Sequence, residues 1–393
     1  MSVVIKPMIK LLVVGQGWDP EGSEEFEYGW RTLVGSLPSV EVIRTHSTDL
    51  PSLWAKAQDA VATRPYLGPE AQVLLLSHPH LVLAPNCLDL LSATCAQPPV
   101  PDTIRHFVVQ AHDSQSPETH MAPDYCTLRG MERFTNALGC SSQVTSIGLH
   151  RQVQLCNVST LRADTDLARL PAVLVANAFA HDYANYHSGT REEVIPHIPE
   201  STRRILDVGG GAGGFLRQLK SQRPVETHLA ELSPQACESA RDHVDQVWQG
   251  DFLSMPITTQ FDCITFLDVL EHTSNPFRWL QQASSLLTDQ GCVVASIPNV
   301  GHWSVIADLL EGRWDYAPVG IHCITHLRFF TRSTIEKLFL QAGLQIEDIQ
   351  SVHLDPPAWW QPPDMNHRLA IDHDSLRSYA YILRARPARA MSS

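Results

Sequence analysis

The sequence has few basic residues for its length. Its 393 residues include 29 Lys and Arg against 42 Asp and Glu, which gives a formal net charge of -13 at pH 7. Proteins that bind nucleic acid usually carry a basic surface, so this balance argues against DNA or RNA as a partner. Hydrophobic residues make up 44% of the chain, which is enough for ordinary globular cores and argues against wholesale disorder.

Paired cysteines and long apolar runs are also missing. No two of the nine cysteines stand at C-x-x-C spacing, and several lie within apolar runs, which favours reduced, buried thiols. No run approaches the roughly 20 apolar residues of a membrane-spanning helix. The opening residues, MSVVIKPMIKLLVV, become polar too soon for a secretion signal. We therefore expect a soluble, cytoplasmic protein that has no membrane partner.

Short apolar runs alternate with helical patterns in the first part of the chain. This alternation predicts an α/β accessory domain over residues 1–165 with a mostly parallel sheet. The polar segment 111–125 reads as a loop. The expected strands are 9–14, 72–76 and 106–110, and the expected helices are near 30–37, 53–62 and 87–91.

A second α/β series predicts another domain over residues 166–393. Ser233 and Pro234 have the form of a helix N-cap followed by proline at the first helical position. The Pro-rich piece 355–364 reads as an ordered loop or a lid. The expected strands are 204–208, 228–231, 247–251, 261–268, 292–297 and 379–384.

The strongest motif is LDVGGGAGG, residues 206–214, which follows an expected strand and opens an expected helix. Glycines at these positions let a backbone turn tightly and pass close to a ligand. Glu231 ends the next strand, where a carboxylate can accept both ribose hydroxyls of a nucleoside. Asp207 precedes the first glycine; it would repel a pyrophosphate but suits a cationic ligand such as S-adenosylmethionine.

At these residues the sequence resembles the class I S-adenosylmethionine-dependent methyltransferases. The resemblance covers roughly residues 180–385 and is closest to a bacterial subgroup of saccharide and secondary-metabolite pathways. Two departures are Gly210, where relatives often carry Cys, and Cys323-Ile324, where the subgroup often has Asp-Arg; we expect Gly210 to be neutral. The motifs that carry the resemblance are Gly250-Asp251-Phe252, FDCITFLDVLEH (261–272), 291–316, 325–344 and the segment 186–191.

The resemblance implies a Rossmann-like, seven-stranded methyltransferase sheet in the C-terminal domain. It also implies S-adenosylmethionine as the cofactor, with Asp251 accepting from the adenine amine. The residues expected to bind the cofactor are Tyr186, Arg191, Asp207, Gly209, Gly211, Gly213, Glu231, Leu232, Asp251, Phe252 and Asp268.

Two histidines are candidate catalytic residues. Methyl transfer to a hydroxyl requires a base, and histidine is the usual one. We prefer His272, which follows the fourth strand at the edge where such sheets bind ligands, with His326 next. A purely structural role is about equally plausible for His272, and it is the favoured interpretation for His302.

Asp268, Glu271 and His272 could form a cation site. The two acids lie three residues apart, as do same-face positions of a helical turn. Some quinone-biosynthesis methyltransferases resemble this segment and use a divalent ion, so Mg²⁺ is one interpretation. We favour the other, in which Asp268 faces the methionine end of the cofactor, Glu271 is structural and no metal is bound.

The segment VLLLSHPHLVLAPNCLDLL, residues 73–91, weakly resembles family 2-like inverting glycosyltransferases. Those enzymes carry Asp-x-Asp where this chain has Ser77, His78, Pro79 and His80, so no carboxylate is present to neutralise a metal. Two histidines without a third ligand seldom make a metal site. We expect a degenerate domain, or an unrelated α/β module, that binds the acceptor or forms a homodimer.

Together these features predict an S-adenosylmethionine-dependent methyltransferase. The expected partner is a small-molecule acceptor, a sugar or secondary metabolite, with oxygen as the preferred target. Two alternatives are a bifunctional glycosyltransferase-methyltransferase and a non-catalytic cofactor-binding scaffold.

Overall fold

The computed structural model divides the chain into two compact units. One comprises Met1–Ala184 with Asp315–Val319, and the other comprises Asn185–Trp314 with Gly320–Ser393. The described residues are 11–16, 40–45, 50–68, 71–76, 81–84, 87–95, 106–113, 127, 129–131, 133, 142–144, 153–162, 172–182, 189–317, 319–362 and 371–388.

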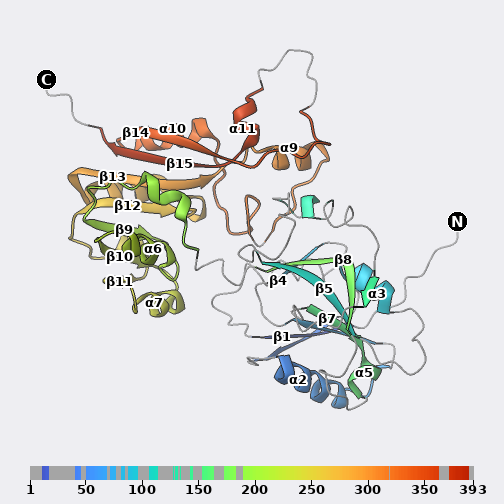
Figure 1. Cartoon of the computed structure of the whole chain (residues 1–393). Helices are drawn as coiled ribbons and strands as arrows, with labels where there is room; N and C mark the ends of the chain where they lie inside the picture. The colour runs from blue at the N-terminus through green and yellow to red at the C-terminus, as the bar shows by residue number, and fades with distance from the viewer. Residues whose placement is uncertain are drawn as a thin grey trace. The chain divides into compact units, whose positions relative to one another are not determined.

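The C-terminal unit is built on a seven-stranded sheet in the order β11-β10-β9-β12-β13-β15-β14 (Figure 1). The first five strands pair in parallel, whereas β15 is antiparallel to both neighbours. This is the predicted Rossmann-like methyltransferase architecture, and the prediction is confirmed. The strands are β9 (Arg204–Val208), β10 (Glu226–Glu231), β11 (Gln246–Gln249), β12 (Phe261–Leu267), β13 (Leu287–Pro298), β14 (Leu344–His353) and β15 (Ser378–Pro387).

Helices and short 3-10 turns connect these strands. Ser233 caps α7 through its Oγ, which accepts from the Ala236 N–H at 3.3 Å, and Pro234 takes the first turn, as predicted. The helices are α6 (Gly214–Gln222), α7 (Pro234–Ala240), α8 (Pro276–Ser285), α9 (Trp303–Leu310), α10 (Arg332–Gln341) and α11 (His373–Arg377). The 3-10 turns are η3 (Glu192–His197), η4 (Phe252–Ser254) and η5 (Leu270–His272).

Two apolar clusters cover the faces of this sheet. One includes Phe252, Phe266 and Phe339, and the other includes Phe215 and Leu229. Strands β9, β12 and β13 supply almost uninterrupted buried residues, because a parallel sheet covered on both faces has no solvent-facing side. A rigid sheet of this kind holds the loops at its carboxyl edge in place.

The N-terminal unit contains an eight-stranded mixed sheet. The prediction of a mostly parallel sheet is wrong: among the described strands, three pairings are parallel and four are antiparallel. The antiparallel strand β7 lies between β3 and β5, and β5 continues to Asp113, into the segment expected to be a loop. The strands are β1 (Leu11–Gln16), β2 (Val40–Thr45), β3 (Gln72–Leu76), β4 (Leu81–Leu83), β5 (His106–Asp113), β6 (Ser142–Val144), β7 (Val153–Asn157) and β8 (Ala172–Asp182).

The unit boundary falls later than the predicted residue 165. Strand β8 pairs in parallel with β5, so the chain up to Asp182 is part of the N-terminal sheet. Helices α2 (Leu50–Ala62), α3 (Cys87–Cys95) and α5 (Val158–Arg162) belong to the same unit. The expected helix at 30–37 and the residues 77–80 lie outside the described residues.

Within the part of the chain that the structure describes, no helix has the length and apolar character needed to span a membrane. The cysteines whose side chains are described are all buried and free of disulfides, as predicted from their placement in apolar runs. They are Cys87, Cys156, Cys237, Cys263, Cys292 and Cys323.

Candidate active site

The carboxyl ends of β9, β10 and β12 form what we call the cofactor edge. Because the three strands are parallel and in register, the residues that follow them meet at one edge of the sheet. Asp207 pairs across the sheet with Leu229 of β10 and with Thr265 of β12. The glycine loop follows β9, Glu231 ends β10 and Asp268 follows β12.

The glycine loop uses a backbone conformation that other residues rarely adopt. Gly209, Gly211 and Gly213 have φ angles of 73°, 56° and 73°. A Cβ at Gly209 would lie 2.8 Å from Cγ2 of Val269, and one at Gly213 would lie 2.8 Å from Cγ2 of Val244. Both the conformation and the space therefore require glycine at these two positions.

Gly210 is also constrained, contrary to the expectation that it is neutral. A Cβ built there would collide with Oδ2 of Asp207 and lie 2.9 Å from Cδ1 of Leu229. Any side chain at this position would require the Asp207 carboxylate to move. The bare backbone at Gly210 leaves room for that carboxylate beneath the loop.

Asp207 is a fully buried carboxyl with one oxygen unpartnered. Its Oδ1 accepts a hydrogen bond from Thr265 Oγ1 at 2.6 Å, whereas Oδ2 is buried and has no hydrogen-bond partner among the described residues. Burial raises the pKa of Asp207 to about 7, against the opposing effects of Thr265 and of the charge on Arg191. A buried oxygen without a partner is costly, so it is suited to a cationic or hydrogen-bonding ligand.

Glu231 joins the end of β10 to the glycine loop. Its Oε2 accepts from the Gly211 N–H at 2.9 Å, and its Oε1 accepts from the Ser233 N–H at 2.8 Å. Each carboxylate oxygen retains a second lone pair that a ribose hydroxyl can use. The neighbouring Leu232 is 71% exposed, which leaves an apolar side chain open beside the carboxylate.

Asp251 and Phe252 have different positions in the turn after β11. Asp251 caps η4 through its carboxylate and is exposed. The Phe252 ring is 2% exposed and packs against Phe266 and Trp279 in the core. Only the backbone of Phe252 is therefore available to contact a cofactor, whereas its side chain anchors the turn in the core.

Arg191 and Asp268 share an unusual backbone conformation in the described part of the chain. They are its only non-glycine residues with positive φ, at 49° and 56°. Arg191 Nη1 donates to Asp268 Oδ2 at 2.6 Å, and Ser296 Oγ donates to Asp268 Oδ1 at 2.8 Å. Burial opposes the charge on Arg191, but Asp268 and Glu193 hold its pKa above the ordinary value. Strain of this kind concentrates at functional sites.

His272 and His326, which we call the imidazole pair, lie together next to this edge. Their ring centroids are 4.6 Å apart and the rings are nearly perpendicular, at 81°. His272 Nδ1 is 2.9 Å from Thr325 Oγ1, whereas His326 Nδ1 donates to the Ile321 carbonyl at 3.0 Å. Burial, with a further contribution from His272, lowers the pKa of His326 to about 4. His326 is therefore a neutral imidazole at physiological pH.

The alternative cation set of Asp268, Glu271 and His272 does not come together as a group of ligand atoms among the described residues. Asp268 has left-handed backbone before η5 and is bound by Arg191, so it does not share a helical face with Glu271. The residues that do come together are Glu271, His272 and His326. Two imidazoles and one carboxylate do not match the oxygen ligands that Mg²⁺ prefers, so we derive no step through a magnesium ion.

Glu271 is buried with neither carboxylate oxygen hydrogen-bonded among the described residues. Burial, reinforced by the charge on Asp268, raises its pKa well above the ordinary value. Its backbone carbonyl accepts from the N–H groups of Leu327 and Arg328 at 2.8 and 3.0 Å. The main chain of Glu271 thus ties the segment carrying His326 to the end of β12.

His302 has a structural role, as favoured from the sequence. It caps α9, and its Nε2 lies 3.0 Å from the Leu354 carbonyl. Burial lowers its pKa to about 4. Trp303 Nε1 donates to the same carbonyl at 3.0 Å.

Three further site residues are not predicted from the sequence: Thr265, Ser296 and Thr325. Each hydroxyl bonds a predicted residue, namely Asp207, Asp268 and His272. Hydroxyl residues are common throughout the chain, so only strand register could have singled out Thr265 and Ser296. Tyr186 lies outside the described residues.

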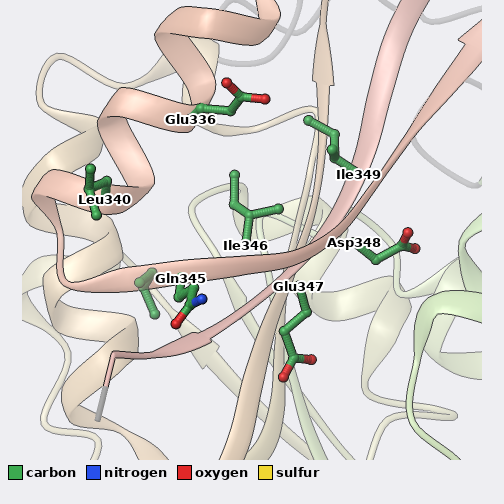
Figure 2. A pocket seen from close by; sticks show the side chains of 8 residues that line it. Glu336, Leu340, Gln345, Ile346, Glu347, Asp348 and Ile349 are labelled. Carbon is green, nitrogen blue, oxygen red and sulfur yellow. The ribbon is translucent and has the colours of Figure 1, made fainter. Parts of the chain in front are cut away.

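A shallow groove also lies between α10 and β14, away from the residues predicted for the site (Figure 2). Leu340 of α10 and Ile346 of β14 contribute its apolar part, and Glu336 lies above them. Glu347 and Asp348 are already paired with arginines or a histidine. The groove therefore offers no unpaired charge on these residues.

Comparison with known proteins bears on the same region. Residues 179–349 match the family described as "Methyltransferase domain". A ubiquinone biosynthesis O-methyltransferase from Psychrobacter arcticus is 27% identical over 193 residues, covering 43% of this chain and 71% of that protein. One from Cereibacter sphaeroides is 26% identical over 179 residues, covering 42% and 70%. A solved putative methyltransferase from Bacillus halodurans is 18% identical, covers 51% of this chain and 100% of its own, and has a TM-score of 0.36.

The C-terminal region therefore contains a methyltransferase domain. The protein is an S-adenosylmethionine-dependent methyltransferase. The cofactor edge fits this cofactor: the unpartnered Oδ2 of Asp207 can receive an ammonium, and Glu231 has lone pairs for ribose hydroxyls.

Proposed function

We propose that the protein transfers a methyl group to a hydroxyl oxygen of a small-molecule acceptor, a sugar or secondary metabolite. The observation that carries the proposal is the imidazole pair, which lies beside the cofactor edge with rings 4.6 Å apart. A hydroxyl acceptor requires a base, whereas an amine that reacts in its neutral form does not. The two curated relatives described above are O-methyltransferases by name.

The cofactor edge would bind S-adenosylmethionine through groups of complementary charge. Asp207 would receive the ammonium and Glu231 the ribose hydroxyls, with Leu232 and Asp251 beside the adenine. Arg191, whose guanidinium is bound by Glu193, Asp268 and Ser296, would attract the methionine carboxylate through its positive charge. The bound cofactor supplies a methyl group on a sulfonium that is already a good leaving group.

His272 would be the base, and His326 would assist in orienting the acceptor. The pKa of His326 near 4 makes it a weak base at neutral pH, which favours His272 for proton removal. His272 is also the more accessible of the two rings, since its side chain is half-buried and His326 is buried. The protein's main contribution is alignment of the acceptor with the methyl group.

The first experiment is calorimetry with S-adenosylhomocysteine, for which we expect micromolar affinity, roughly -8 kcal/mol. The absence of both heat and thermal shift at millimolar ligand would contradict the cofactor assignment.

The second experiment is a panel of hydroxylated sugars and phenols with matched amines, in which release of S-adenosylhomocysteine is measured. Turnover confined to the amines would contradict O-methylation.

For the N-terminal unit we propose acceptor binding or dimerisation. A live glycosyltransferase is the second candidate function, favoured only by the weak sequence resemblance of residues 73–91. A nucleotide-sugar hydrolysis assay tests it, and we expect no activity because the Asp-x-Asp carboxylates are absent from 77–80. Light scattering of the full chain tests dimerisation.

A further inference from the structure

Thr325 lies between the preferred base and a buried cysteine. Its Oγ1 is 2.9 Å from Nδ1 of His272 and 3.2 Å from Sγ of Cys323. Thr325 belongs to the segment that the main chain of Glu271 ties to η5. The hydroxyl is therefore held beside the ring by a different part of the chain from the one that carries the histidine.

The contact between Thr325 and His272 is compatible with two forms of the ring, because a threonine hydroxyl can both donate and accept. In a neutral imidazole one nitrogen donates and the other accepts. When Nδ1 donates to Thr325 Oγ1, the hydroxyl proton is available to Cys323 Sγ, and Nε2 keeps its lone pair. Only that tautomer leaves Nε2 able to take a proton from an acceptor hydroxyl. A partner on the second nitrogen that sets the tautomer is a recurrent feature of histidine bases.

We propose that Thr325 is a positioning residue that holds His272 in the Nδ1–H tautomer and so leaves Nε2 as the proton acceptor. The proposal rests on the proposed role of His272 as base. In this arrangement Cys323 Sγ completes the chain by accepting a hydrogen bond from the Thr325 hydroxyl. The neighbouring His326 does not compete for Thr325, because its own Nδ1 donates to the Ile321 carbonyl.

The direct test is nitrogen NMR of histidine-labelled full-length protein with S-adenosylhomocysteine bound, which needs no acceptor. We expect His272 of the wild-type protein to be predominantly the Nδ1–H form when neutral. Thr325→Val should shift the population towards the Nε2–H form and move the titration of His272 to lower pH, because the imidazolium loses an acceptor for Nδ1–H. Thr325→Ser should restore the wild-type state.

Thr273→Val is the matched control. Thr273 follows His272 directly, is buried, and uses its hydroxyl only for the Leu270 carbonyl at 2.9 Å among the described contacts. It should leave the tautomer and titration of His272 unchanged. The other titratable groups around the imidazole pair stay constant in this comparison: Asp268, Glu271, His322, Cys323 and His326.

Turnover on an acceptor from the panel gives the second measurement. Thr325→Val should lower kcat by roughly tenfold with little change in KM, and it should have no additional effect in a His272→Ala background, because the two residues act as one unit. The proposal is overturned if Thr325→Val leaves the tautomer as in the wild type, or if Thr273→Val changes it equally. A His272→Ala variant with full turnover contradicts the proposed base instead, whatever Thr325 does to the tautomer.

Discussion

The cofactor edge and the imidazole pair differ in what they are made of. The edge consists of charged side chains around a left-handed backbone, with Asp207, Glu231, Arg191 and Asp268 all linked to neighbours. The pair consists of rings and hydroxyls, with His326 held neutral by burial. Charge suits the recognition of a zwitterionic, cationic cofactor, whereas neutral imidazole suits proton removal. The comparison implies that cofactor affinity and chemical rate can be changed separately.

The largest effect expected is on rate. His272→Ala should lower kcat by roughly 10²–10⁴-fold at saturating cofactor, because the acceptor loses its base, while calorimetry shows unchanged affinity for S-adenosylhomocysteine. The wild-type kcat should fall on the acid side, since a protonated imidazole cannot accept a proton. His353→Ala, at a histidine on β14 paired with Asp374, serves as the control.

His326→Ala should do less damage than His272→Ala. If it proves the more severe variant, the two roles are exchanged. If neither variant lowers kcat, the acceptor needs no base, and the imidazole pair does not define the reaction.

The next effect is on affinity. Glu231→Ala should weaken S-adenosylhomocysteine binding by roughly 1.5–3 kcal/mol, because a charged acceptor of two hydroxyls is lost, while kcat at saturation changes little. Glu226→Ala, on the same strand at the opposite edge and paired with Arg204, should leave affinity unchanged. If both variants bind S-adenosylhomocysteine with the same affinity, Glu231 does not bind the ribose hydroxyls.

A smaller effect concerns pH and Asp207. Binding of an ammonium requires the carboxylate, and the pKa of this group in the free protein is about 7. The affinity for S-adenosylhomocysteine should therefore fall by up to about tenfold per pH unit below 7. Asp207→Asn should bind weakly with a flat profile between pH 5 and 7.

The same carboxyl affects folding with a definite sign. Its folded pKa of about 7 lies above its ordinary value of 3.8, so the folded free protein holds more protons than the unfolded chain between these values. Its contribution to stability therefore decreases as pH rises from about 4 to about 7, and levels off above. Thermal unfolding of wild type and Asp207→Asn across this range measures it.

The smallest effect expected is that of a chelator. Because the residues around Glu271 do not match the ligands of Mg²⁺, EDTA should leave turnover unchanged. Loss of activity in EDTA that Mg²⁺ restores would instead make these residues a ligand set. The imidazole pair would then bind a metal ion, and it would no longer contrast with the charged cofactor edge.

Much of the C-terminal sheet could be predicted because its central strands are continuous apolar runs. Strand β14 was missed for a physical reason: a bulge between Ile346 and Asp348 breaks the alternation of buried and exposed residues on which strand prediction depends. The glycine loop and Glu231 carry their chemistry in residue type and spacing. The Arg191–Asp268 pair joins residues 77 apart, and no local pattern reveals such a contact.

Gly210 also shows that a local sequence pattern does not reveal a tertiary contact. In sequence it is one more glycine in a glycine-rich loop, but in the fold its missing side chain makes room for the Asp207 carboxylate. Phe252 shows the reverse, because its motif suggests a ligand contact while its ring belongs to the core. Residue type identifies a site, but packing decides which atoms of each residue are available to it.

The backbone carbonyl of Glu271 receives the amides of both Leu327 and Arg328. As a result, the backbone of the segment that carries His326 and Thr325 can separate from η5 only if these two amides lose their common acceptor. Hydrogen exchange at Leu327 and Arg328 therefore reports on assembly of the catalytic residues, independently of any substrate. Slowed exchange of both amides together, on addition of a candidate acceptor, would identify a ligand that binds the assembled form.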